Sequence, residues 1–196
     1  MSKVLTQKEK VAAVLNEATL LGITIDPALR TASICLHALT LPDDTGPSGT
    51  ELEVRLIGVT RAAFSIRDGN WTDRSAPVVS ISQEEISEIV DSFGHLPIYG
   101  DNFLDSDNKW LKEWGDRLSL NWILAAGESS PHSFDFFQEG HDRHLDARIW
   151  FETIVFLDRN GVEVRLDDLV QAANRWWAGM RAGDPRTASS GIAPLK

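Results

Sequence analysis

The sequence predicts an α+β protein with two antiparallel β-meander units, an N-terminal helix, a middle helical segment and a C-terminal helix. Three observations lead to this fold class. Runs of alternating apolar and polar residues, the period of a β-strand, are joined by short turns. Apolar residues at helical spacing mark both ends of the chain. One stretch of the first strand-rich region also resembles a stretch of the second.

We expect the 196 residues to form one compact unit with four parts. Residues 1–81 hold the N-terminal helix and the first β-meander, and residues 82–115 form a helical connector. Residues 116–182 hold the second β-meander and the C-terminal helix, and residues 183–196 form a disordered tail. Because the connections between successive strands are short, these strands should pair as antiparallel neighbours.

The N-terminal helix has a clear start signal. Thr6 followed by Glu9 has the spacing of a capping box, in which each side chain bonds the backbone of the other residue. Apolar residues then recur at helical intervals, and they are Val11, Val14, Leu15, Ala18 and Leu21. Gly22 is a suitable end, so the helix should have about four turns.

The first strand-rich unit contains four candidate strands, at residues 23–25, 32–38, 51–58 and 62–66. Cys35 alternates with apolar residues in the second of them. We interpret Cys35 as a small buried hydrophobe, which requires that both faces of its strand be covered.

The middle segment changes to a helical pattern. Ser82 and Glu85 repeat the capping-box spacing ahead of apolar residues at helical intervals. Trp110, Leu111 and Trp114 suggest one short helix that ends at Gly115.

The second unit contains strands near residues 118–122 and 134–137, and residues 146–157 form either one long strand or a tight pair of strands. A hairpin turn follows at Asn160-Gly161. The C-terminal helix should begin near Leu166 and end near Gly179. The apolar stripe of this helix includes Trp176 and Trp177, and we expect these two residues to anchor the helix to the second meander.

The two units share a five-residue pattern. Residues 52–56 and residues 145–149 both read apolar, acidic, small apolar, Arg, apolar, and residues 33–36 face residues 133–136 upstream. The units either descend from a duplication or share a pattern common to all alternating strands. In both cases Arg55 and Arg148 should be exposed and paired across strands with a carboxylate.

The charge balance restricts the partners. Nineteen Lys and Arg residues stand against 29 Asp and Glu residues, so the net charge is −10. Such a surface repels a phosphate backbone and an anionic membrane, so we expect neither nucleic acid nor membrane as a partner. A basic protein is the more natural partner, although the charge also serves solubility.

Cysteine usage and the N-terminus predict a cytoplasmic protein. The single cysteine excludes an intrachain disulfide, and no signal peptide or long apolar run is visible.

The sequence contains no phosphate-binding loop, dinucleotide fingerprint, nucleophile elbow or zincin motif, so we name no catalytic residue and no cofactor. The His- and Asp-rich segment 132–146 offers the residue types that bind zinc, iron or manganese. We nevertheless expect no metal there. His132 precedes a strand, whereas His141 and His144 follow it, and a ~6-residue strand separates its ends by ~20 Å.

Two segments supply candidate binding residues. The first is rich in carboxylates and resembles a structured surface loop, and the second is the polar turn of the second unit. The candidates are Tyr99, Asp101, Asp105, His141, Asp142 and His144.

Residues 52–59, LEVRLIGV, followed by residues 64–66, FSI, form a charged strand, a Gly-Val step and a second strand. Over residues 18–69 this pattern resembles uncharacterised bacterial proteins grouped with the immunity proteins of polymorphic toxin systems. The resemblance implies an acidic cytosolic protein that neutralises a partner by binding it, without catalytic residues.

Two hypotheses about function therefore stand. The first is a non-catalytic protein-binding module, immunity-like, and the second is a metal-dependent enzyme that uses segment 132–146. The oligomeric state is not predicted.

Overall fold

The computed structural model describes residues 4–43, 49–70, 72–73, 75–100, 103–107, 111 and 115–190. It confirms the predicted α+β class with antiparallel strands. In chain order the elements are α1 (Gln7–Leu15), β1 (Thr19–Asp26), β2 (Thr31–Ala38), β3 (Thr50–Ile57), β4 (Arg61–Asp68), α2 (Ile86–Ser92), β5 (Ile98–Tyr99), β6 (Leu120–Ile123), β7 (His132–Glu139), β8 (Arg143–Phe151), β9 (Thr153–Asp158), α4 (Leu166–Ala182) and the 3₁₀ helix η1 (Pro185–Ser190).

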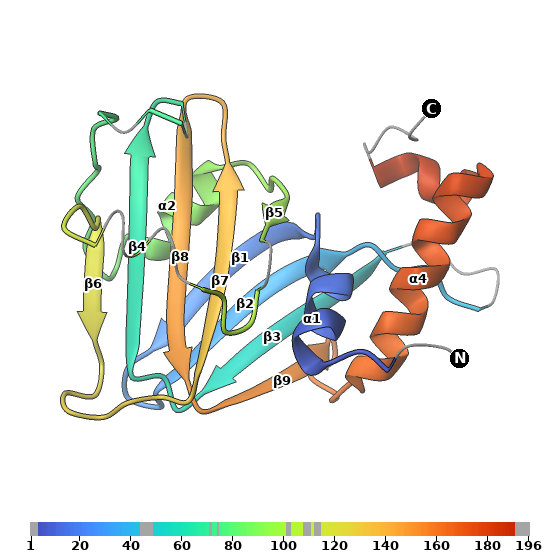
Figure 1. Ribbon diagram of the computed structural model, residues 1–196, viewed down its shortest axis with the longest axis horizontal. Coiled ribbons are helices and arrows are strands. Elements are labelled where there is room, and N and C mark those ends of the chain that lie inside the picture. The colour runs from blue at the N-terminus through green and yellow to red at the C-terminus, as the bar shows by residue number, and fades with distance from the viewer. Residues whose placement is uncertain are drawn as a thin grey trace.

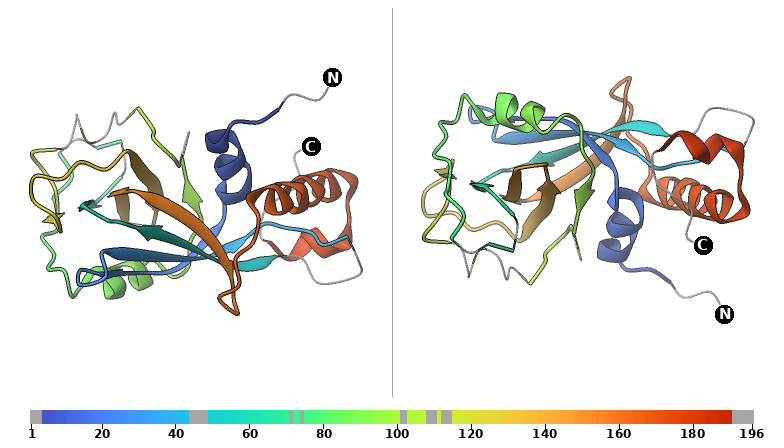
Figure 2. Two further views of the ribbon diagram at one scale, coloured as in Figure 1. Left: turned by 90° about the horizontal axis from the view of Figure 1, so that it is seen from below. Right: turned by 90° about the horizontal axis from the view of Figure 1, so that it is seen from above.

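The strands form two sheets that face each other, and their strands cross at a clear angle (Figure 1). Sheet A has the strand order β1-β2-β3-β9, and sheet B has the order β5-β7-β8-β4-β6. Figure 2 shows the two sheets as separate layers. The hydrophobic core lies between them, because the alternate residues of each strand point inward and are buried.

The last strand of each predicted meander crosses into the other sheet. The chain passes from β3 through Gly58 into β4 of sheet B, and from β8 through Glu152 into β9 of sheet A. Consequently β3 pairs with β9 and β4 pairs with β8. The expectation that all successive strands pair as neighbours is therefore wrong at these two corners. It is also wrong for β6 and β7, because β6 pairs with β4 at the edge of sheet B. Gly58 has a φ of +71°, which lets the strand turn toward the second sheet instead of folding back on itself.

The helix α1 is shorter than predicted. Its capping box between Thr6 and Glu9 is present, but the helix ends at Leu15, and Gly22 lies inside β1 at a bulge. Glu17 has a φ of +62°, which ends the helical path before the predicted Gly22.

The C-terminal helix α4 starts where predicted and runs one turn further, to a left-handed cap at Gly183. Trp176 is fully buried, but against Leu39 and Leu41, which follow β2. Trp177 is only partly buried. The prediction that these residues anchor the second meander is therefore wrong, because an amphipathic stripe shows that a helix is buried but does not identify the surface that covers it.

Two further expectations need correction. Cys35 is exposed, because its side chain points to the outer face of β2, away from the core between the sheets. Partial burial raises the pKa of the Cys35 thiol, and the nearby carboxylate of Glu53 raises it further, whereas the charge of Arg55 lowers it. The predicted disordered tail is wrong for residues 185–190, which form η1 with Thr187 buried, and its last residues, 191–196, lie outside the described part of the chain.

The predicted helix at Trp110–Trp114 falls largely outside the described residues. The helix α2 confirms the helical pattern after Ser82, and it packs beside β1. None of the described helices has the length and apolar character needed to span a bilayer.

Candidate functional site

The β7–β8 hairpin distributes the His- and Asp-rich segment over two ends and one face of sheet B. His132 begins β7 and lies opposite Phe151, whereas His144 lies opposite Glu139 at the other end of the hairpin. His141 and Asp142 occupy the turn between the strands. The three imidazoles therefore sit at different places, with the length of β7 between His132 and the turn.

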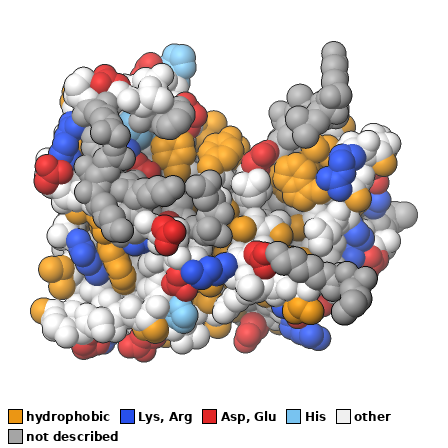
Figure 3. Space-filling view, in the orientation of Figure 1, with side chains coloured by type: hydrophobic (Ala, Val, Ile, Leu, Met, Phe, Trp, Pro, Cys, Tyr) orange, Lys and Arg blue, Asp and Glu red, His pale blue; other side chains and the backbone are white. Residues whose placement is uncertain are grey.

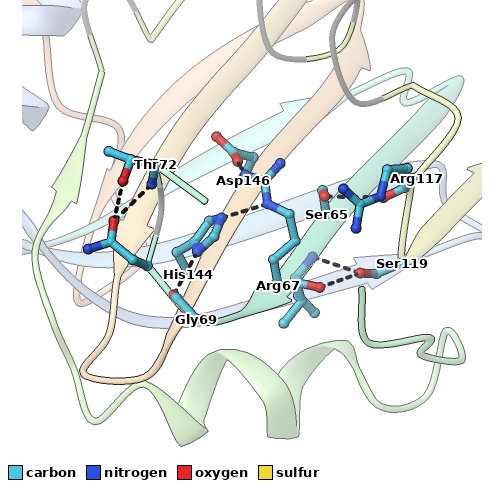
Figure 4. Close-up of polar contacts among 10 residues, drawn as sticks. Ser65, Arg67, Gly69, Thr72, Arg117, Ser119, His144 and Asp146 are labelled. Carbon is cyan, nitrogen blue, oxygen red and sulfur yellow. Dashed lines mark hydrogen bonds and ion pairs between the residues drawn. The ribbon is translucent and has the colours of Figure 1, made fainter. Parts of the chain in front are cut away.

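His144 points to the outer face of sheet B and is 1% exposed. Its Nε2 accepts a hydrogen bond from Nε of Arg67 at 2.6 Å, so the ring proton sits on Nδ1, 3.4 Å from the carbonyl oxygen of Gly69 (Figure 4). Burial, and then the charge of Arg67, lower the pKa of His144. This imidazole is therefore neutral and serves as an acceptor inside the protein.

Four buried charges lie beside His144 on the same face, and we call them the charge ladder. Arg67 of β4 pairs with Asp146 of β8, and Arg148 of β8 pairs with Asp135 of β7. Burial raises the pKa of Asp146 to about 6, against the opposing effect of Arg67. Burial also raises the pKa of Asp135, opposed by Arg148.

The charge ladder is engaged by the protein itself. Arg148 donates from Nη2 to the carbonyl oxygen and to Oγ of Ser106, each at 2.9 Å. Arg148 thus pairs across strands with a carboxylate, as predicted, but it is buried and not exposed. Paired buried charges of this kind are weak evidence for stability and better evidence for a specific register. The alternation of His144, Asp146 and Arg148 along β8 was the sequence signal for this face.

A hollow of about 610 Å³ lies between the end of α2 and the β7–β8 turn, and we call it the hairpin hollow. It is lined by Asp68, Ser92, Phe93, Leu96, Gly140, His141, Asp142 and Arg143. Its volume falls in the range of ligand sites. Of the six predicted binding residues, His141 and Asp142 are the two that line it.

The rim of the hairpin hollow is charged and its floor is apolar. The side chain of Asp142 is 89% exposed, and Arg143 donates from Nε to Asp68 at 2.7 Å. Phe93 and Leu96 supply the floor. A Cβ atom at Gly140 would lie 2.8 Å from the carbonyl oxygen of Arg143 and 3.2 Å from the Phe93 ring, so glycine permits this close packing.

Acidic groups of α2 add to this end of the molecule. Glu88 and Asp91 are exposed on α2, which carries no Lys or Arg. In Figure 3, acidic side chains and a histidine project at the top, where Figure 1 draws the β7–β8 turn.

The remaining predicted residues lie elsewhere. Tyr99 is in β5 and partly exposed, and burial, with Glu17 and Glu139, raises the pKa of its hydroxyl. Oδ2 of Asp105 lies 3.2 Å from Nδ1 of His132, and Oδ1 of Asp105 accepts a hydrogen bond from the backbone N–H of Ser133. Asp101 lies outside the described residues. The structure therefore does not bring the six predicted residues together.

Side chains that could bind a metal lie in pairs in the described part of the chain, such as His132 with Asp105 and His141 with Asp142. In that part, no three His, Cys, Asp or Glu side chains are grouped as a metal site requires.

Comparisons with protein-family models, with curated proteins and with solved structures find no match to this chain. The resemblance of residues 18–69 to immunity proteins accordingly stays a prediction.

Proposed function

We propose that this protein is a non-catalytic binding protein that takes a basic side chain of a protein partner into the hairpin hollow. The observation that carries the proposal is the combination of an apolar floor, Phe93 and Leu96, with the exposed carboxylate of Asp142 at the rim. The second carboxylate of the rim, Asp68, is already paired with Arg143. Lys and Arg combine a long apolar stem with a charged head, so both parts of such a side chain find a match here.

The charge of the whole molecule supports a basic partner. The net charge of −10 attracts a positively charged surface and speeds its encounter at low ionic strength. The exposed carboxylates of α2 place part of this charge beside the hollow.

An immunity-like role in the bacterial cytoplasm is the setting that we propose for this binding. Immunity proteins act by binding, and an apolar floor beside the exposed carboxylate of Asp142 is a surface that a partner's side chain can fill. Exposed Cys35, which has no cysteine partner, suits a reducing compartment.

Calorimetric titration with an arginine-rich peptide, Ac-Gly-Arg-Gly-Arg-Gly-NH2, tests the proposal. We expect saturable binding that weakens as salt is added. Asp142→Asn should weaken binding two- to fivefold, about 0.4–1 kcal/mol for an exposed ion pair. Glu163→Gln, which removes an exposed carboxylate far from the hollow in sequence and fold, is the matched control. Equal losses in both variants would show only non-specific attraction, and the proposal would fail.

A further inference from the structure

Three of the four outer edges of the two sheets are bonded by other parts of the chain. At one side of the sandwich β1 and β5 meet, where the N–H of Leu20 donates to the carbonyl oxygen of Leu96 at 3.1 Å and the N–H of Ile98 donates to that of Ala18 at 2.9 Å. At the other side, residues 162–164 bond the outer edge of β9. Cover of this kind keeps an edge strand from pairing with another chain.

The fourth edge, that of β6, has no such cover among the described residues. The N–H of Leu124 donates to the carbonyl oxygen of Thr60 at 2.9 Å, and Asn121 and Ile123 lie opposite residues of β4. Because the bonds of an antiparallel ladder alternate, the N–H and C=O groups of Asn121 and Ile123 point away from β4. In the described part of the chain these groups have no hydrogen-bond partner.

The sequence of β6 also lacks the usual protection of an edge strand. Its four residues, LNWI, include no charged residue and no proline. The side chain of Ile123 is 59% exposed on the outer face, and the half-buried Trp122 packs against the core on the inner face. An open, uncharged and apolar edge of this kind is a template for another β-strand.

The open edge of β6 is complementary to itself. When two copies of the strand run antiparallel about a two-fold axis at Trp122, Asn121 of each copy lies opposite Ile123 of the other copy. Each of these pairs exchanges two hydrogen bonds, so every open N–H and C=O group of both strands gains a partner. The two Trp122 residues then face each other directly, in the closer type of antiparallel pair, and they extend the core across the interface.

We propose that the protein forms a two-fold symmetric dimer in which β6 pairs with β6 of a second copy and joins the two copies of sheet B into one continuous sheet. Figure 1 draws β6 at the left margin of the molecule, with no labelled strand beyond it. The dimer does not depend on the function proposed for the hairpin hollow, which lies at the β7–β8 turn.

The dimer should be weak and should respond to salt. The paired strands are short, and each copy carries a net charge of −10, so the two copies repel each other at long range. Added salt screens this repulsion and should strengthen the dimer, whereas it should weaken peptide binding in the hairpin hollow. The two associations are therefore distinguishable.

Sedimentation equilibrium of the full chain tests the dimer over protein concentrations from about 10 to about 500 µM at about 0.3 M salt. We expect a reversible equilibrium between monomer and dimer. Ile123→Pro removes an N–H that has no described partner in the monomer, and edge strands tolerate proline, so the dimer should weaken by about tenfold or more. Ile123→Val keeps the N–H and should leave the equilibrium within about twofold. Asp142→Asn should also leave it unchanged.

Disulfide trapping tests the register and does not depend on the proline variant. In a Cys35→Ser background, proteins with Asn121→Cys and Ile123→Cys are mixed in equal amounts and mildly oxidised. Opposite residues in such a pair have Cα atoms about 5.5 Å apart, within reach of a disulfide. Val162→Cys replaces a side chain that is 60% exposed in the β9 turn, so its mixture with Asn121→Cys measures random collision.

The mixture of Asn121→Cys with Ile123→Cys should form the mixed disulfide dimer at least about fivefold faster than the control mixture. A protein that stays monomeric at every concentration would overturn the proposal. So would a dimer that persists unchanged in a folded Ile123→Pro variant, or trapping no faster than in the control mixture.

Discussion

At the scale of single residues, burial and pairing act in opposite directions on the charge ladder. Asp146 is 7% exposed, and its pKa of about 6 shows that the loss of hydration outweighs the attraction of Arg67. The folded protein therefore binds a proton at Asp146 more tightly than the unfolded chain does. Stability from this group is fully present below a pH of about 4 and is lost as the pH rises toward 6.

Replacement of the titrating group isolates this contribution. Between pH 7 and pH 5, the wild-type protein should gain on the order of 1 kcal/mol of unfolding free energy relative to Asp146→Asn. Urea denaturation of both proteins at the two pH values measures the difference. The absence of any difference between the two proteins would contradict this prediction. It would mean that the ion pair with Arg67 outweighs desolvation and keeps the pKa of Asp146 at or below its ordinary value, because such a carboxyl is ionised in both states at both pH values.

At the scale of secondary-structure elements, the sequence predicts where a helix or strand forms better than it predicts which surface that element packs against. The capping box of Thr6 and Glu9 and the start of α4 at Leu166 depend on neighbouring residues, and both are confirmed. The packing of Trp176 on Leu39 and Leu41 joins residues more than 130 positions apart, which no local pattern encodes.

The two tryptophans of α4 should differ in their effect on stability. Trp176→Ala removes a fully buried ring and should cost ~3–5 kcal/mol, which lowers the melting temperature by roughly 10 °C. Trp177→Ala should cost clearly less, because that ring is partly exposed. Thermal unfolding followed by circular dichroism measures both. A larger effect at Trp177 would contradict the register of α4.

The β7–β8 turn should depend on Gly140. In Gly140→Ala the new methyl group meets the carbonyl oxygen of Arg143 and the Phe93 ring, so we expect a loss of about 1–3 kcal/mol in unfolding free energy. Peptide binding by the hairpin hollow should weaken as well. Gly94→Ala is a useful comparison, since no atom lies near its Cβ position and only its backbone conformation resists the change. If both variants bind the peptide equally well, the close packing at Gly140 does not shape the hollow.

At the scale of the whole molecule, the exchange of strands between the sheets could not be predicted. Strand periodicity identifies β3, β4, β8 and β9 but does not show that the chain bends at Gly58 and Glu152. Apart from the edge strand β6, the two sheets have matching strand orders, β1-β2-β3-β9 and β5-β7-β8-β4, although β5 comes from the predicted connector and not from the second unit. That order is compatible with the duplication that the matching residues suggest, which stays a prediction.

The candidate site could be predicted only in part, because its residues come from separate segments that meet only in the folded protein. His141 and Asp142 are adjacent in the sequence and remain together, whereas Phe93 and Leu96 reach the hairpin hollow only through the packing of α2 and the segment that follows it. His144 alternates with core residues, and the strand period alone does not distinguish an open face from a covered one.

The location of peptide binding tests the central claim most directly. Amide chemical shifts of the ¹⁵N-labelled protein are recorded while the arginine-rich peptide is added. The account predicts that the largest changes occur at Phe93, Leu96, Gly140 and Asp142, and that these changes shrink in Asp142→Asn. Changes spread evenly over the acidic surface, or confined to sheet A, would contradict a binding site in the hairpin hollow.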